Sequence, residues 1–185
     1  MKFDCIWPIV EPVVGSYQKE ELELLAKTAK GCKQVMEIGC MAGRSTLTLA
    51  LAMEGGTLTV VDPFVFSTSS IEDFYKTMKK CPPQIKWSLL VQLSQDLEYG
   101  QIGVQEMIHI DGSHDQEDVL EDLIFCSSMT YTMAIHDYGN KGLPGVEKAV
   151  KEFLGNDPLI STPFSAKQWK ISELTGTTMV LRRRR

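Results

Sequence analysis

Apolar residues follow two alternating patterns along most of this chain. Short continuous apolar runs, typical of buried strands, occupy residues 35–38, 58–61, 85–92, 106–110 and 131–135. Stretches with helical spacing or helix-forming composition occupy residues 17–30, 45–53, 71–80, 115–126 and 144–154. Strands and helices that alternate in this way predict a parallel sheet covered by helices on both faces.

The remaining segments depart from this alternation. Residues 1–15 contain Pro8 and Pro12 and are expected to form an N-terminal arm or loop. Residues 94–100 read as a short helix or turn, and residues 168–174 and 177–181 read as a closing hairpin. The predicted fold is α/β: a Rossmann-like, doubly wound, mostly parallel seven-stranded sheet with a C-terminal antiparallel hairpin. We expect residues 1–185 to form a single domain.

Composition and charge narrow the range of partners. The chain is 43% hydrophobic and carries a net charge of -5, so it is not built to bind nucleic acid. The basic run at residues 182–185 is interpreted as a solvated tail. Trp7 lies in the N-terminal arm, which could pack on a second subunit, so a homodimer stays open.

Cysteine usage and hydropathy indicate a cytoplasmic protein. The five cysteines are odd in number and include no C-x-x-C pair, which argues for reduced thiols rather than a disulfide framework. No basic segment followed by a long apolar run opens the chain, and no apolar stretch approaches the ~20 residues of a membrane span. We therefore expect neither a signal peptide nor membrane association.

The first group of candidate functional residues follows the apolar run at residues 35–38. Gly39 and Gly43 bound a tight loop, and Asp62 ends the next apolar run. Glycine allows a ligand to approach the backbone, and an acid at a strand end can accept hydrogen bonds from ribose hydroxyls. The middle glycine of a dinucleotide fingerprint is absent, which favours an adenosine-bearing ligand without phosphates over NAD or FAD. An ordinary strand-to-helix turn is the alternative.

The later strand ends carry a second polar group. Asp111 follows the fourth run, with His114 three residues on, and His136 and Asp137 follow the fifth. Such groups at neighbouring strand ends could bind a divalent cation or supply a general base. His109 lies inside the fourth run and is interpreted as a packed histidine. Phe64 and Phe66 are either core residues or the walls of an apolar pocket.

Together these motifs resemble one family. They are Val35-Met36-Glu37-Ile38-Gly39 with Gly43-Arg44-Ser45-Thr46, Val61-Asp62-Pro63, His109-Ile110-Asp111-Gly112-Ser113-His114-Asp115, Ile135-His136-Asp137-Tyr138, and Pro144-Gly145-Val146. The chain is similar, over about residues 15–154, to class I S-adenosylmethionine (SAM)-dependent O-methyltransferases of the catechol-O-methyltransferase-like and macrolide-sugar branch.

The resemblance implies a site and a mechanism. It assigns the cofactor SAM to Glu37, Gly39, Gly43, Ser45, Asp62, Ser94, Gln95 and Asp111, with Asp62 on the ribose and Ser94 and Gln95 on adenine. It assigns Mg²⁺ to Asp111, Asp137 and His136, although His136 stands where several metal enzymes carry a carboxylate. His114 is the expected base, with Asp111 beside it as a catalytic residue.

The expected reaction is methyl transfer to a hydroxyl of a small-molecule acceptor. SAM's sulfonium makes the methyl group electrophilic, so the protein has to align the hydroxyl and remove its proton. Two alternatives stay open: N-methylation on the same fold, and a non-catalytic module that binds SAM or another adenosine ligand. An NAD-dependent oxidoreductase is a more distant one.

Overall fold

The computed structural model describes residues 1–65, 70–155 and 168–184. Its centre is a seven-stranded sheet in the order β3-β2-β1-β4-β5-β7-β6. The strands are β1 (Gln34–Ile38), β2 (Gly56–Val61), β3 (Ile85–Leu90), β4 (Met107–Ile110), β5 (Thr132–Ile135), β6 (Trp169–Thr175) and β7 (Thr178–Arg183). Strands β1 to β5 pair in parallel, while β7 is antiparallel to β5 and to β6. The predicted fold is confirmed.

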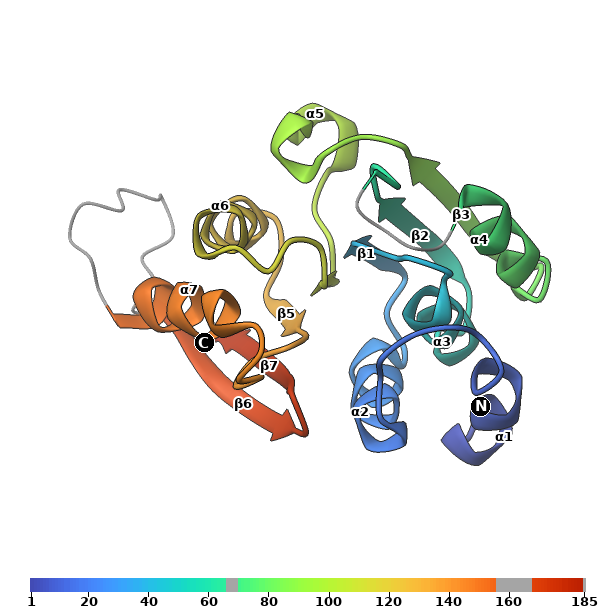
Figure 1. Ribbon diagram of the computed structural model, residues 1–185. Helices are drawn as coiled ribbons and strands as arrows, with labels where there is room; N and C mark the ends of the chain where they lie inside the picture. Colours follow the sequence, from blue (N-terminus) through green and yellow to red (C-terminus); the bar gives the residue numbers. More distant parts are fainter. Residues whose placement is uncertain (66–69, 156–167, 185) are drawn as a thin grey trace.

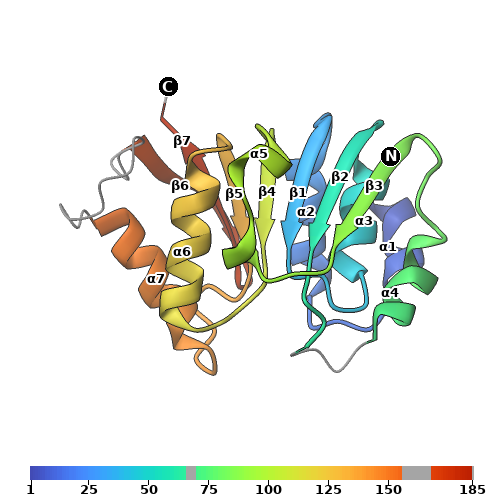
Figure 2. The same ribbon diagram turned by 90° about the horizontal axis from the view of Figure 1, so that it is seen from above.

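Helices cover both faces of this sheet, as Figures 1 and 2 show. They are α1 (Phe3–Val10), α2 (Lys19–Ala29), α3 (Arg44–Ala52), α4 (Ile71–Met78), α5 (Tyr99–Ile102), α6 (Gln116–Ser127) and α7 (Pro144–Gly155), with a 3-10 turn η1 (Ser94–Asp96). Buried side chains of α1 to α4 form one apolar cluster with one face of the sheet. Those of α6 and α7 form a second cluster with the other face. Among the described helices, none combines the length and apolar character that crossing a membrane requires.

The N-terminal arm is a correction to the sequence prediction. Residues 3–10 form the helix α1 despite Pro8, which costs that helix the hydrogen bond to the carbonyl of Asp4. The loss is tolerated because Ile6 and Val10 are fully buried against the rest of the domain. Trp7 also packs on its own chain, with the guanidinium of Arg44 5.9 Å from its ring centre. Whether the protein forms a homodimer stays a prediction.

Smaller differences affect the boundaries. The stretch predicted as one short helix or turn at residues 94–100 divides into η1 and α5. Most other elements begin or end within two residues of their predicted bounds. Phe66 and Arg185 lie outside the described residues.

The strand register brings the predicted site residues to one edge. Ile38 pairs with Val61 on one side and with Ile110 on the other, and Ile110 pairs with Ile135. The residues that directly follow these four strand ends are Gly39, Asp62, Asp111 and His136. The chain order reverses between β1 and β4, and such a switch point is where open α/β sheets bind their ligands.

Candidate active site

The loop after β1 is bounded by two glycines whose backbones adopt the left-handed conformation. Gly39 has φ +80°, and a Cβ placed there would lie 2.0 Å from the carbonyl oxygen of Asp111. Gly43 has φ +88° and serves as the N-terminal cap residue of α3. Between them, Met41 also has a positive φ, +47°. Position 39 thus requires glycine, because the backbone at the end of β1 lies so close to that at the end of β4 that a Cβ has no room.

Asp62 holds this loop in place. Its Oδ2 accepts hydrogen bonds from the backbone nitrogens of Cys40 at 2.8 Å and Met41 at 3.0 Å. Its Oδ1 accepts from the nitrogen of Phe64 at 2.7 Å. The carboxylate is buried, so these charge-assisted bonds tie the end of β2 to the loop after β1. Within the part of the chain that the structure describes, three backbone nitrogens donate to this carboxylate.

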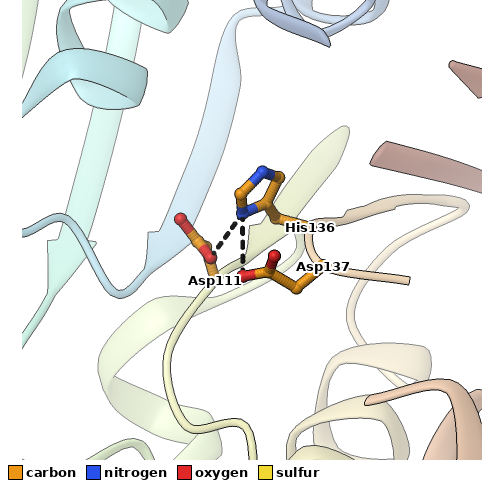
Figure 3. A group of neighbouring side chains, drawn as sticks. All are labelled: Asp111, His136 and Asp137. Carbon is orange, nitrogen blue, oxygen red and sulfur yellow. Dashed lines mark hydrogen bonds and ion pairs between the residues drawn. The ribbon is translucent and has the colours of Figure 1, made fainter. Parts of the chain in front are cut away.

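Three side chains from neighbouring strand ends converge beside this loop, as Figure 3 shows. Asp111, His136 and Asp137 each offer one potential metal-ligand atom, and these atoms lie within 4.8 Å of one another. The Nδ1 atom of His136 lies 3.0 Å from Oδ1 of Asp111 and 3.2 Å from Oδ2 of Asp137. The sequence-predicted metal residues are therefore brought together.

Two carboxylates and an imidazole form a ligand set that suits a divalent cation, provided that the imidazole nitrogen gives up its hydrogen. Two carboxylates suit Mg²⁺ or Mn²⁺, and an imidazole suits other transition metals. In the arrangement seen, Nδ1 of His136 donates to carboxylate oxygens, which only accept, so that nitrogen carries a hydrogen. A cation that took His136 as a ligand would have to displace this proton.

Asp137 has an unusual backbone and a histidine partner. Its φ of +59° is rare for a residue with a side chain, and such strain is concentrated at functional sites. Its Oδ2 lies 3.1 Å from Nε2 of the partly exposed His114, and its Oδ1 accepts from Asn140. The side-chain hydrogen bond to Asp137 outweighs burial and raises the pKa of His114 above its ordinary value. His114 is thereby oriented at the edge of the site.

The approach of α7 determines where the His114 backbone lies. A Cβ on Gly145 would lie 2.2 Å from the carbonyl oxygen of His114 and 2.9 Å from the nitrogen of Gln116. Glycine in the first turn of α7 therefore lets this helix touch the loop after β4. The Pro-Gly pair seen in the sequence fits this contact: Pro144 suits the first turn of a helix, and Gly145 allows the close approach.

Behind His136 lies Glu21, which the sequence analysis missed. Oε1 of Glu21 accepts from the nitrogen and hydroxyl of Thr177, in the turn between β6 and β7. Oε2 accepts from the nitrogen of Gln18 and lies 3.7 Å from Nε2 of His136. Burial alone would raise the pKa of Glu21, but the nearby His136 imidazole and the hydrogen bonds from Gln18 and Thr177 lower it to about 2. The Gln18–Glu21 spacing signals a helix cap, and nothing in it indicates His136.

Glu37 lies deeper than the edge of the sheet. It is fully buried, with Oε1 2.9 Å from Nδ1 of His109 and Oε2 accepting from the hydroxyl of Thr46. His109 is also fully buried, as expected of a packed histidine. The hydroxyl of Tyr17 lies 3.0 Å from Nε2 of His109 and donates to Oδ2 of Asp111 at 2.6 Å. Tyr17 is a second residue that the sequence analysis missed.

On the other side of the site, Ser94 and Gln95 occupy η1. Ser94 is half-buried and Gln95 is exposed. Beneath them, Asp122 of α6 is only 3% exposed, and its Oδ2 has no hydrogen-bond partner among the described residues. Burial raises the pKa of Asp122 to about 7, with the Ser94 hydroxyl lowering it and Asp118 and Glu121 adding to the rise.

This carboxyl predicts a pH-dependent stability. The pKa of Asp122 is higher in the folded chain than in the unfolded one, so the folded state binds more protons between about pH 4 and 7 and stability falls as pH rises through that range. We expect Asp122→Asn to reduce the loss of unfolding free energy between pH 5 and 8 by about 2–3 kcal/mol. Urea unfolding at pH 5 and at pH 8 measures this change in unfolding free energy. The exposed Glu117→Gln on the same helix is the control, and an equal pH dependence in wild type and Asp122→Asn would contradict the prediction.

The comparisons with known proteins agree with this geometry. A protein-family model described as a methyltransferase domain matches residues 36–138, from β1 through the cluster at the end of β5. No curated protein sequence matches the chain.

Solved structures share the fold at low sequence identity. The O-methyltransferase TomG from Streptomyces achromogenes, in complex with SAM, has a TM-score of 0.64 at 14% identity, covering 91% of this chain and 82% of its own. An O-methyltransferase from Bacillus cereus, in complex with SAH, has a TM-score of 0.63 at 11% identity, covering 100% and 90%. The N-methyltransferase NodS from Bradyrhizobium japonicum has a TM-score of 0.57 at 12% identity, covering 90% and 94%.

Proposed function

Because this chain belongs to the methyltransferase-domain family, we propose that it transfers the methyl group of SAM to a hydroxyl oxygen of a small molecule. The observation that carries the proposal is the convergence, at one sheet edge, of the glycine loop, Asp62 and the Asp111–His136–Asp137 cluster with His114 beside it. The acidic net charge of -5 favours a small acceptor over a nucleic acid.

The cofactor would occupy the loop side of this edge. Gly39, Gly43 and Ser45 would face the methionine part, and the Asp62 carboxylate would accept a hydrogen bond from a ribose hydroxyl. Ser94 and Gln95 would lie against the adenine. Glu37 has both oxygens engaged inside the protein, so it would support the loop through Thr46 rather than touch the cofactor.

The acceptor would lie on the cluster side. The acceptor oxygen would take the methyl carbon as S-adenosylhomocysteine leaves with the electron pair of the broken methyl–sulfur bond. The hydroxyl proton would pass to Nδ1 of His114, because Nε2 faces the Asp137 carboxylate and so already carries a hydrogen. Asp137 holds that imidazole in place. A divalent cation such as Mg²⁺, held by Asp111, Asp137 and a deprotonated His136, would lower the pKa of the hydroxyl.

The role of His114 is directly testable. We expect His114→Asn to lower the methyl-transfer kcat by about a hundredfold or more, because a positioned base is lost, while SAM affinity stays unchanged. Mass spectrometry of products from a panel of phenols and sugar hydroxyls measures turnover, and calorimetry measures SAM binding. Asp115→Asn, which alters the exposed neighbouring residue, is the control and should turn over like wild type.

Other outcomes would replace the proposal. SAM binding without turnover on any acceptor indicates a binding module, and a product methylated at nitrogen indicates an N-methyltransferase. A His114→Asn protein as active as wild type would remove His114 from the mechanism. Failure of the wild type to bind SAM at all would refute the proposal itself.

A further inference from the structure

Tyr17 lies where the N-terminal segment meets the active site. It precedes α2, is buried, and stacks on the imidazole of His136 with ring centres 3.9 Å apart and planes 23° apart. Its hydroxyl is also within hydrogen-bond distance of Asp111 and His109. One side chain from outside the sheet thus contacts the ends of both β4 and β5.

The hydrogens of this group can be assigned from its acceptors. An ionised Asp111 only accepts, so the 2.6 Å contact requires the Tyr17 hydroxyl to donate to Oδ2. The hydroxyl has a single hydrogen, so at its 3.0 Å contact with His109 it must accept from an Nε2–H. Nδ1 of His109 faces Glu37, and both of these side chains are fully buried. A hydrogen on either Nδ1 of His109 or Oε1 of Glu37 completes that contact, so the buried pair is compatible with an Nε2–H that faces Tyr17.

Arg44 holds the segment that delivers Tyr17. Its guanidinium donates to the carbonyl oxygens of Val10, Glu11 and Gly15, and reaches that of Tyr17 at 3.5 Å. These carbonyls span the connection between α1 and α2, while Arg44 itself begins α3 directly after the glycine loop. Tyr17 is consequently anchored to the same rigid element as the predicted cofactor loop.

We infer that Tyr17 is a positioning residue that fixes the Asp111 carboxylate. By holding Oδ2, it leaves Oδ1 directed at His136 and, beyond it, Asp137. The inference deepens the proposed function, on which it rests in treating this cluster as the reaction site. Tyr17 acts through Asp111 and needs no contact with cofactor or acceptor.

The test uses Tyr17→Phe, which keeps the stacked ring and removes the hydroxyl. The chain has three histidines, and each lies in this network, so ¹⁵N spectra of the imidazole rings report on it without any substrate. In the wild type we expect a hydrogen on Nε2 of His109. In Tyr17→Phe we expect shifted or broadened His136 signals and a kcat at least about tenfold lower, with SAM affinity within about twofold.

The control is Tyr131→Phe, which removes a hydroxyl from a tyrosine that is 62% exposed at the opposite end of β5. It should change neither the spectrum nor kcat. The inference is overturned if His109 lacks the Nε2 hydrogen in the wild type, a result that needs no variant to fold. Wild-type His136 signals in Tyr17→Phe, or altered signals with an unchanged kcat, also overturn it. If no acceptor is ever methylated, the proposed function fails, while the ring spectra still decide the role of Tyr17.

Discussion

Alanine at Gly39 is expected to lower the free energy of unfolding by about 3 kcal/mol or more and to abolish SAM binding. The added Cβ would lie 2.0 Å from the carbonyl oxygen of Asp111 and 2.7 Å from the Cα of Gly112. These are backbone atoms at the join of β1 and β4, so they cannot rotate away as a side chain could. Relief requires the glycine loop to move, and Asp111 lies on the other side of the same contact.

Gly31→Ala separates this clash from backbone strain. Gly31 has φ +85°, close to the +80° of Gly39, but a Cβ there meets nothing within 4 Å. Gly31→Ala should lower the free energy of unfolding by only roughly 1–2 kcal/mol, the cost of placing alanine in the left-handed conformation, and should leave SAM affinity unchanged. Chemical unfolding and calorimetry with SAM measure both quantities. Equal losses in the two variants would show that close approach of the strands is not what Gly39 serves.

Loss of the Asp62 carboxylate should weaken SAM binding by about a hundredfold. Asp62→Ala removes the acceptor for the backbone nitrogens of Cys40 and Met41. The loop after β1, in which Met41 has a positive φ, thereby loses the hydrogen bonds that stabilise its conformation. It also removes the position proposed for a ribose hydroxyl. Calorimetric titration with SAM measures the effect, and thermal unfolding shows how far the loop itself has loosened.

Two further variants, Asp62→Asn and Asp4→Ala, serve as comparisons for the effect of Asp62→Ala on SAM binding. Asp62→Asn keeps one acceptor oxygen and should fall between alanine and wild type. Asp4→Ala removes an exposed acid in α1 and should bind SAM like wild type. Unchanged affinity in Asp62→Ala would mean that the cofactor lies elsewhere on the sheet, and would refute the proposed cofactor site.

The family and the fold were both accessible from the sequence, for a local reason. Apolar runs and helical stripes are set by neighbours in the chain, and β1 to β5 appear where those patterns predict them. The hairpin of β6 and β7 was also recognisable, because a Thr-Gly turn separates two alternating runs. The resemblance to class I methyltransferases is confirmed by the match over residues 36–138. Small-molecule specificity, metal use and cytoplasmic location stay predictions.

The N-terminal region shows where local reasoning fails. Two prolines predicted an arm or loop at residues 1–15, but α1 forms because burial of Ile6 and Val10 offsets the hydrogen bond lost at Pro8. Burial depends on a partner surface elsewhere in the chain, and no local pattern contains it. The same holds for Tyr17, whose partner Asp111 is 94 residues away.

What the sequence by itself determined is the set of strand ends that carry chemistry: Gly39, Asp62, Asp111 with His114, and His136 with Asp137. Each end is a local feature, an apolar run that stops at a polar residue. The tertiary structure alone decided how these ends meet, because register aligns Ile38, Val61, Ile110 and Ile135 and so places the residues after them side by side. It alone also decided which groups surround them. Tyr17 and Glu21 reach the cluster through contacts that only folding makes, with Tyr17 donating to Asp111 and Glu21 lying beside His136.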